Sequence, residues 1–253
     1  MELPPIGLGT MGIDDPETIT RAIDLGYRHL DTAQIYENER VVGEGIARAD
    51  VDRDELTVAT KVWADSLAPE DVRRTTLESL DRLGLDSVEL LYVHRPIEAY
   101  DPERTLPAFD ALREEGLIEE VGVSNFTTEQ LEEARTILDS PIVAHQVECH
   151  PLYRQRGLRE YAREAGHVLV AYSPLAQGAV FDVPELREIA EKHDSTPAAV
   201  SLAWLAGLES VVTIPKASDE DHLEANLAAR ELELDEEDVT RIEKIDREEK
   251  LFE

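Results

Sequence analysis

Four polar residues, Asp31, Tyr36, Lys61 and His94, carry side chains that together can move a proton onto a carbonyl oxygen. A phenol has an ordinary pKa of about 10, so Tyr36 needs a nearby cation to exchange protons at neutral pH. Lys61 can supply that cation, and Asp31 can keep it charged and oriented. A neutral His94 can donate a hydrogen bond to the same oxygen. The set predicts proton transfer to a carbonyl oxygen as a hydride reaches its carbon, without a metal or a covalent nucleophile.

Eight short apolar runs alternate with amphipathic helical patterns along the chain. The runs cover residues 6–9, 28–31, 56–60, 88–93, 118–123, 142–147, 168–172 and 211–214. Acidic or proline-containing segments typical of helix starts lie at 15–17, 68–70, 101–103 and 127–129. Strands that alternate with helices pair in parallel through right-handed crossovers. The pattern predicts an α/β fold with a single (β/α)8 TIM barrel and short loops.

Two stretches refine this barrel. Residues 183–208 form the longest helical pattern but contain Pro197, so we expect two helices there. Residues 235–247 predict an extra C-terminal helix outside the barrel. Because no linker or change in composition interrupts the chain, residues 1–253 are predicted to form one domain.

Polar side chains follow seven of the eight predicted strands. In a (β/α)8 barrel the carboxyl ends of all strands meet on one face, where catalytic groups gather. We therefore expect these residues on one rim: Asp31, Lys61, His94, Ser124, Asn125, Gln146, Glu148, Tyr172, Ser173, Pro215 and Lys216.

A glycine motif offers a competing interpretation. Residues 7–12 match G-x-G-x-x-G, and Asp31 follows at the distance that a dinucleotide-binding Rossmann unit requires. However, the preceding segment 1–6 contains Glu2 and two prolines and is too short for a buried central strand. The glycines are therefore assigned to a tight exit from the first barrel strand.

The charge is strongly negative, with 56 Asp and Glu against 25 Lys and Arg and a net charge of −31. Acids are scattered through the helical stretches, while Lys occurs only at 61, 192, 216, 244 and 250. Such a surface disfavours nucleic acid and anionic membranes and predicts a halophilic source with molar salt in its cytosol. In a lysine-poor chain, a lysine at a strand end is expected to have a chemical role.

The single Cys149 excludes an intramolecular disulfide and a multi-cysteine zinc site. Residues 1–10 lack a basic segment followed by an apolar run, and no apolar stretch approaches bilayer length. We therefore expect a cytoplasmic protein with no membrane partner, and we expect it to be a monomer.

Ordered motifs across essentially the whole chain resemble the aldo-keto reductase family. They lie at residues 26–43, 60–63, 91–96, 121–126, 146–151, 172–175 and 214–216. The resemblance implies a (β/α)8 barrel that binds NADPH without a Rossmann domain and reduces a small carbonyl substrate, an aldehyde or a ketone, to an alcohol. Compact prokaryotic aldehyde and diketogluconate-type reductases are the most similar members.

The resemblance also implies roles for individual residues. Tyr36 would be the general acid, Lys61 and Asp31 would tune it, and His94 would orient the carbonyl. Cys149 matches a structural position beside the cofactor site. The implied cofactor-binding residues are Ser124, Asn125 and Gln146 on the nicotinamide carboxamide, Tyr172 on its ring, Ser173 and Leu175 beside it, Lys216, Ser218 and His222 near the phosphates, and Asn226 at the adenine.

Several positions depart from the family pattern. Ala217 and His222 stand where Ser and an Arg are usual, and a mostly neutral imidazole grips a 2′-phosphate poorly, so NADH use is possible beside NADPH. In the expected substrate pocket Trp63 is retained, but Met11 and Arg95 replace tryptophans. Arg95 either forms a salt bridge at the rim or attracts a carboxylate or polyhydroxy substrate. Short loops and a short C-terminal segment predict an open, permissive pocket.

Three other functions compete with this interpretation. A Schiff-base aldolase could use Lys61 as a nucleophile, but Asp31 would keep that lysine protonated. A non-catalytic, cofactor-binding family member is disfavoured because all four catalytic positions are present. A metal-dependent hydrolase needs converging ligands, and His145 and His150 lack partners at matching rims.

Overall fold

The computed structural model describes residues 3–252, and Met1, Glu2 and Glu253 lie outside it. Its eight parallel strands follow one another in chain order, each pairing with the next. They are β1 (Leu8–Gly9), β2 (His29–Asp31), β3 (Thr57–Val62), β4 (Val88–Val93), β5 (Ile118–Ser124), β6 (Ile142–Glu148), β7 (Val168–Tyr172) and β8 (Val211–Thr213). This confirms the predicted barrel strands.

The ring is closed between its first and last strands. Ile6 forms a parallel bridge with Thr213, and the Gly7 amide donates to the Thr213 carbonyl at 2.8 Å. A Cβ on Gly7 would lie 2.7 Å from the His29 ring, and one on Gly9 would lie 2.7 Å from the Ile214 carbonyl oxygen. These glycines let β1 approach β2 and β8 closely, so they serve the barrel and not a phosphate loop.

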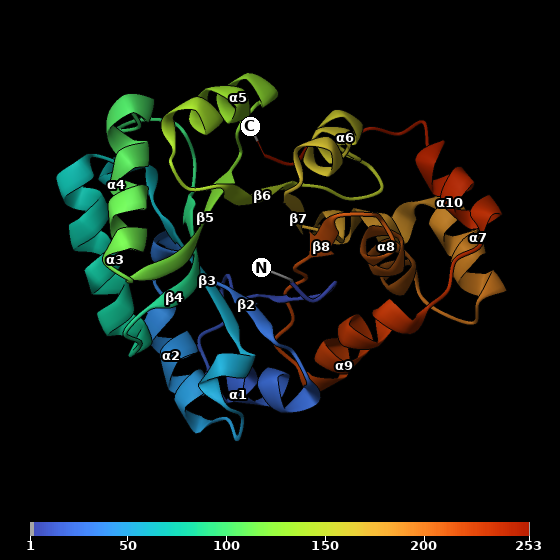
Figure 1. The fold of residues 1–253 in the computed structure, drawn as a ribbon. Coiled ribbons are helices and arrows are strands. Elements are labelled where there is room, and N and C mark those ends of the chain that lie inside the picture. Colours follow the sequence, from blue (N-terminus) through green and yellow to red (C-terminus); the bar gives the residue numbers. More distant parts are fainter. Residues whose placement is uncertain (1–2, 253) are drawn as a thin grey trace.

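Helices surround the strands on all sides (Figure 1). They are α1 (Pro16–Leu25), α2 (Glu39–Arg48), α3 (Pro69–Leu83), α4 (Pro102–Glu114), α5 (Thr128–Ile137), α6 (Arg156–Ala165), α7 (Pro184–Lys192), α8 (Pro197–Ala206), α9 (Glu220–Ala228) and α10 (Glu236–Glu243). Short 3-10 turns include η1 (Gln34–Tyr36), η2 (Arg53–Glu55), η3 (Ala64–Ser66), η4 (Ala176–Asp182) and η5 (Ala229–Glu231).

Helix starts follow the sequence signals. Asp15 accepts a hydrogen bond from the Glu17 amide, and Pro16 opens α1. Thr127 and Gln130 form a reciprocal capping box at α5. The stretch 183–208 divides into α7 and α8, as Pro197 predicted.

The extra helix α10 is shorter than the predicted 235–247, because the chain leaves it after Glu243 and turns back toward the barrel. Its backbone then bonds elsewhere: the Glu249 amide donates to the Leu152 carbonyl at 2.8 Å. Amides at Leu251 and Phe252 donate to the Glu148 side chain. The predicted helix therefore ends before residue 247, and the segment beyond it bonds to the barrel and not to α10.

Side chains fill the inside of the barrel, so it is a packed core and not a pore. A separate and larger apolar layer lies between strands and helices. The interior cluster consists of Ala59, Leu90, Tyr92, Ala144, Val170, Val212 and Ile214. This apolar floor lies beneath the carboxyl ends of the strands, an end that we call the mouth. Within residues 3–252, no helix has both the length and the apolar character needed to cross a membrane.

Candidate active site

The mouth brings Asp31, Tyr36, Lys61 and His94 together, and we call these four residues the tetrad. Asp31 ends β2, Tyr36 ends the turn η1 that follows it, Lys61 lies on β3, and His94 follows β4. The Lys61 ammonium donates to an Asp31 carboxylate oxygen, to the Thr32 carbonyl at 2.8 Å, and to the Tyr36 hydroxyl at 3.5 Å. Lys61 is fully buried, so these groups replace all of its hydration.

Gln146 on β6 provides a further contact to the Lys61–Asp31 ion pair. The second Asp31 oxygen accepts a hydrogen bond from the Gln146 amide at 2.7 Å, and Asp31 is 1% exposed. Both carboxylate oxygens are thus occupied, one by an ammonium and one by a neutral donor. The position of Lys61 is fixed by contacts from β2 and its following loop, while β6 holds Asp31 from the other side.

Electrostatics keep Lys61 charged and Tyr36 neutral. Burial works against the charged form of Lys61, but the Asp31 carboxylate and the Tyr36 oxygen outweigh it and raise its pKa. Burial likewise raises the pKa of Tyr36, and the Lys61 charge opposes that rise. At neutral pH, Tyr36 is therefore a phenol with a proton to give, beside a cation that stabilises the phenolate.

His94 is the neutral member of the tetrad. Burial, together with the charges of Lys61 and Arg95, lowers its pKa to about 2. Its ring meets Tyr36 edge-on at 6.0 Å between centroids and Trp63 at 4.9 Å. A neutral imidazole has one N–H to donate, which suits a carbonyl oxygen better than a second full charge beside Lys61 would.

Amide and hydroxyl groups adjoin the tetrad on the side of β5 and β7. The Asn125 amide donates to the Ser124 hydroxyl at 3.0 Å and to the His94 carbonyl at 3.1 Å. Its oxygen accepts from the Tyr172 hydroxyl at 3.0 Å. Asn125 adopts a left-handed backbone (φ 62°), which turns the chain at the strand end. Hydrogen-bonding groups and an aromatic ring thus lie side by side at the mouth.

The remaining predicted cofactor residues lie around the ends of β7 and β8. Ser173 has a left-handed backbone, and Leu175 packs against both large apolar clusters. Lys216 is exposed, and the Ser218 carbonyl accepts from the Thr18 hydroxyl at 3.4 Å. In α9, Asn226 is buried. These residues continue from the mouth toward α9, in the order of the sequence motifs.

His222 does not present a free ring. Its Nδ1 lies 2.6 Å from the Asp219 carboxylate, which also caps α9 by accepting from the His222 amide. The position where the family pattern has an arginine thus holds an imidazole bound to an acid. Any phosphate here would meet a negative charge as well as the positive end of the helix.

The pocket residues differ in exposure. Trp63 lies against His94, whereas Met11 is 64% exposed in the turn after β1. Arg95 lies near enough to His94 and Tyr172 to oppose protonation of the first and favour ionisation of the second. Among residues 3–252, no carboxylate pairs with Arg95 within 4.0 Å. The salt-bridged alternative for Arg95 therefore has no partner in the described chain.

Glu148 has a role that the sequence did not reveal. Its carboxylate is buried and accepts from the amides of Leu251 at 2.6 Å and Phe252 at 3.0 Å, and His150 lies 3.0 Å away. The Phe252 ring then meets Tyr172 edge-on at 5.7 Å. Nothing local in the sequence links positions so far apart; only the location of Glu148 at a strand end hinted at the mouth.

Cys149 is a structural residue by its environment. Its thiol is fully buried, and burial raises its pKa to about 12. A thiolate is the reactive form of cysteine, so this side chain is inert at neutral pH. In the described residues, no group of three or more His, Cys, Asp and Glu side chains is arranged to hold a metal ion.

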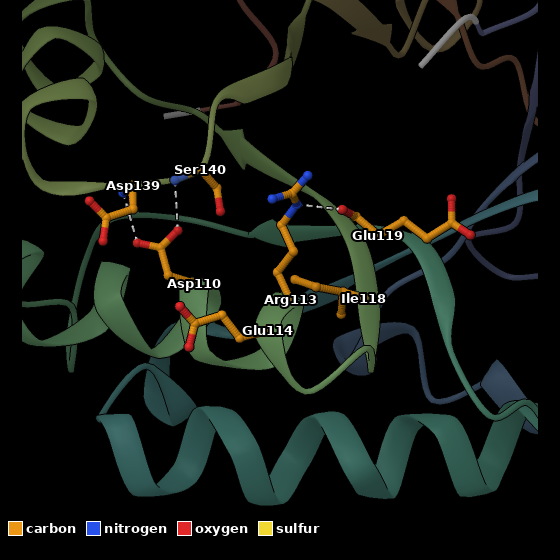
Figure 2. Close-up of a pocket in the computed structure, with 7 residues that line it drawn as sticks. All are labelled: Asp110, Arg113, Glu114, Ile118, Glu119, Asp139 and Ser140. Atoms are coloured by element: carbon orange, nitrogen blue, oxygen red, sulfur yellow. Dashed lines mark hydrogen bonds between the residues drawn. The ribbon is translucent and has the colours of Figure 1, made fainter.

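A cavity of about 320 Å³ lies at the opposite end of the barrel, where β5 and β6 begin (Figure 2). Asp110 accepts from the amides of Asp139 at 3.0 Å and Ser140 at 2.9 Å, while Arg113 donates to the Glu119 carbonyl at 2.7 Å. None of the predicted site residues lines this cavity. Its polar groups serve the loops that enter the strands.

The match to a family model decides the family. Residues 5–247 match the model described as the aldo/keto reductase family. The chain belongs to the aldo/keto reductase family. Membership makes the protein an oxidoreductase that acts on carbonyl compounds, and the family in general uses NAD(P)H.

Named relatives span nearly the full chain. The chain is 37% identical to methylglyoxal reductase DkgB of Escherichia coli O157:H7, over 97% of this chain and 94% of that protein. It is also 37% identical to glyoxal reductase of Bacillus subtilis, over 99% and 92%. A crystal structure of an aldo-keto reductase from a Medee basin deep-sea metagenome library superposes with a TM-score of 0.94 at 32% identity, covering 100% and 95%.

Proposed function

We propose that this aldo/keto reductase reduces aldehydes or ketones to alcohols with Tyr36 as the proton donor. The observation that carries the proposal is the fully buried Lys61 ammonium, whose contacts are the Asp31 carboxylate, a carbonyl and the Tyr36 hydroxyl. A buried charge with these partners is costly for the fold and has a clear chemical use.

In the proposed reaction, the substrate oxygen lies between the Tyr36 hydroxyl and the His94 ring. A bound NAD(P)H would supply a hydride to the carbonyl carbon. Tyr36 gives its proton to the oxygen, and the Lys61 charge stabilises the phenolate that remains. Asp31 holds Lys61 in place and charged. His94 stays neutral and donates a hydrogen bond that orients the carbonyl.

The arrangement at β5 to β7 fits a nicotinamide. A planar amide-bearing ring needs a flat aromatic surface with hydrogen-bonding groups beside it, and Tyr172 with Ser124, Asn125 and Gln146 offers both. We assign the remainder of an extended cofactor to the residues that continue toward α9, namely Ser173, Leu175, Lys216, Ser218, His222 and Asn226.

The cofactor preference is proposed to be weak. NADPH is the family expectation, but Asp219 already binds the His222 ring, and its carboxylate would repel a 2′-phosphate. Lys216 and Ser218 can compensate in part. We therefore expect use of NADPH with NADH as an effective alternative.

The substrate pocket is assigned to Met11, Trp63 and Arg95. Arg95 has no carboxylate partner in the described residues and adjoins His94, so it can attract an anionic carbonyl compound. Arg95→Ala should raise the KM for a carbonyl acid at least severalfold and leave the KM for a matched neutral aldehyde nearly unchanged. Equal KM values for both substrates in wild type and variant would remove this assignment.

Two alternative functions are less well supported. A Schiff-base aldolase needs a neutral amine, whereas the Asp31 carboxylate raises the pKa of Lys61. A non-catalytic binding role leaves the buried Lys61–Asp31 pair without a purpose. Borohydride treatment with a carbonyl compound should therefore leave the chain unmodified.

The decisive experiment compares wild type with Tyr36→Phe in a panel of aldehydes and ketones, assayed with NADPH and NADH. Tyr36→Phe should lower kcat by about 10³-fold or more while cofactor affinity stays close to that of wild type. Tyr161→Phe is the matched control, because its hydroxyl lies outside the mouth and binds Glu132. Turnover within a few-fold of wild type in Tyr36→Phe would refute the assignment.

The location, oligomeric state and salt adaptation of the enzyme are also proposed. We infer a cytoplasmic, monomeric, one-domain enzyme adapted to molar salt, supported by the net charge of −31. Running the same panel at low and at molar KCl tests the last point. Equal stability and activity in dilute buffer and in molar KCl would contradict salt adaptation.

A further inference from the structure

The contact between Lys61 and Tyr36 is the least constrained in the tetrad. The Lys61 nitrogen lies 3.5 Å from the Tyr36 oxygen, which is long for a hydrogen bond. The same nitrogen lies 5.0 Å from the centroid of the Tyr36 ring. Tyr36 belongs to the turn η1 and Lys61 to the strand β3, so their distance depends on how these two segments are held together. The groups that hold them lie behind β3, on its outer face.

One half of this outer network grips β3 next to Lys61. Successive strand residues face opposite sides, so Thr60 points away from the barrel interior where Lys61 lies. The Thr60 hydroxyl donates to one Glu39 oxygen at 2.6 Å. Arg82 of α3 donates from Nε to the other Glu39 oxygen at 2.8 Å, and its Nη2 lies 2.6 Å from the same oxygen. Glu39 is 1% exposed and opens α2, three residues after Tyr36.

The other half grips η1. Gln34 is the first residue of the turn that Tyr36 ends. Its amide nitrogen donates to the Ser79 hydroxyl at 3.1 Å, and its amide oxygen accepts from the Trp63 backbone at 3.0 Å. Ser79 also accepts from Arg82 at 3.1 Å. Ser79 on α3 is thus the point at which the two halves meet.

We propose that Gln34 and Ser79 are positioning residues that set the distance between Lys61 and Tyr36. Gln34 joins the Tyr36 turn to the residue just after β3, and Ser79 ties that joint to the Arg82–Glu39–Thr60 chain beside Lys61. The side-chain hydrogen bonds of both residues go to Trp63, to Arg82 and to each other, and not to a tetrad side chain. The consequence for turnover rests on the proposed function, but the geometric effect does not.

The hydrogen bonds form a ring that closes through the β3 backbone between Thr60 and Trp63, and its inner members are buried. Ser79, Thr60 and Glu39 are all buried. A buried polar network that loses one member leaves its partners to re-form their bonds by moving. A shift of about 1 Å at a reacting group can cost about 10²-fold in rate.

The test compares Gln34→Leu and Ser79→Ala with Thr76→Val. Thr76 is a matched control: it is buried on the same helix three residues earlier, and its hydroxyl bonds only within the helix, to the Val72 carbonyl at 2.7 Å. With an aldehyde that wild type reduces, we expect kcat to fall about 30-fold in Gln34→Leu and about fivefold in Ser79→Ala, with KM and cofactor affinity nearly unchanged. Thr76→Val should retain the wild-type kcat.

A second readout does not need turnover. In protein carrying tyrosine labelled with ¹³C at the ζ carbon, the resonance missing from Tyr36→Phe identifies Tyr36. That resonance should shift at neutral pH in Gln34→Leu and Ser79→Ala, since the nearby ammonium moves, and should stay in place in Thr76→Val.

The outcomes are separable. The positioning role is overturned if the Tyr36 resonance keeps its wild-type place in both variants, whether kcat is unchanged or falls together with the folded fraction. If the resonance shifts but Tyr36→Phe still turns over, the positioning role stands and the proposed function fails.

Discussion

The two ends of the barrel handle charge in opposite ways. At the mouth, Lys61 and Asp31 are enclosed and contact each other directly. At the other end, Asp110 binds backbone amides beside a cavity whose further acidic side chains belong to Glu114, Glu119 and Asp139 (Figure 2). Enclosed ion pairs contribute little net stability, while hydrated carboxylates cost little. The enclosed Lys61–Asp31 pair therefore fits a chemical role, whereas the exposed carboxylates at the far end do not require one.

The largest expected effect is on stability at the mouth. Lys61→Met would leave Asp31 buried without its cation, so unfolding free energy should fall by about 3–5 kcal/mol. Urea unfolding monitored by circular dichroism measures it. Arg73→Met breaks the exposed Arg73–Glu115 pair instead and should leave the urea midpoint nearly unchanged. Similar losses in the two variants would erase the contrast between enclosed and hydrated charge.

The next largest effect is expected on the pH dependence of the unfolding free energy. Burial lowers the pKa of His29, two residues before Asp31 on β2, to about 4. The unfolded chain binds a proton there near pH 6.5, so this histidine contributes stability that is fully present above pH 6.5 and is lost as pH falls toward 4. His29→Leu should remove up to about 3 kcal/mol of this acid dependence. The measurement is urea unfolding across pH 4–7.

Thr76→Val provides the control for that experiment. It alters a buried residue without removing a titratable group, so it should retain the wild-type slope of stability against pH. A His29→Leu variant with an unchanged slope would show that His29 is not held neutral by burial.

A smaller effect is expected on cofactor choice. His222→Arg would place a guanidinium where the family pattern has one, so the NADPH to NADH ratio of kcat/KM should rise roughly three- to tenfold. Asp219 limits the gain by binding the new side chain, and Asp219→Asn in the same background should increase it. A ratio that does not move would place the 2′-phosphate away from α9.

The smallest effect is expected at the far end. Asp110→Asn keeps an oxygen for one backbone amide and loses the charge that binds both, so unfolding free energy should fall by about 1 kcal/mol. Steady-state kinetics should give the wild-type kcat, since the cavity lies at the end opposite to the tetrad. A tenfold loss of kcat would mean that the two ends are coupled.

Most of the barrel and the four residues of the tetrad could be predicted from the sequence. Strand runs and helix starts are local signals, and the strand ends converge by topology, so Asp31, Lys61 and His94 could be expected on one rim. The predicted strands and the division at Pro197 are confirmed. The family motifs then added roles for individual residues, which stay predictions until tested.

Contacts between distant segments could not be predicted. Ser79 has an ordinary helical context, and only folding brings it to Gln34, 45 residues earlier. The end of α10 at Glu243, about one turn before the predicted residue 247, has the same origin. The helical pattern continues there, but the segment beyond it bonds through the amides of Leu251 and Phe252 to the Glu148 carboxylate. Local propensity yields to such tertiary bonds.

The docked C-terminal segment also decides how the protein should be handled. Leu251 and Phe252 are bonded at the mouth beside Tyr172, whereas Leu3 packs against the barrel interior at the other end of the strands. An affinity tag, fluorophore or surface linker at the C-terminal end would therefore follow a segment bonded beside the proposed cofactor-binding residues. One at the N-terminal end would precede a segment that packs at the opposite end of the strands, away from the mouth.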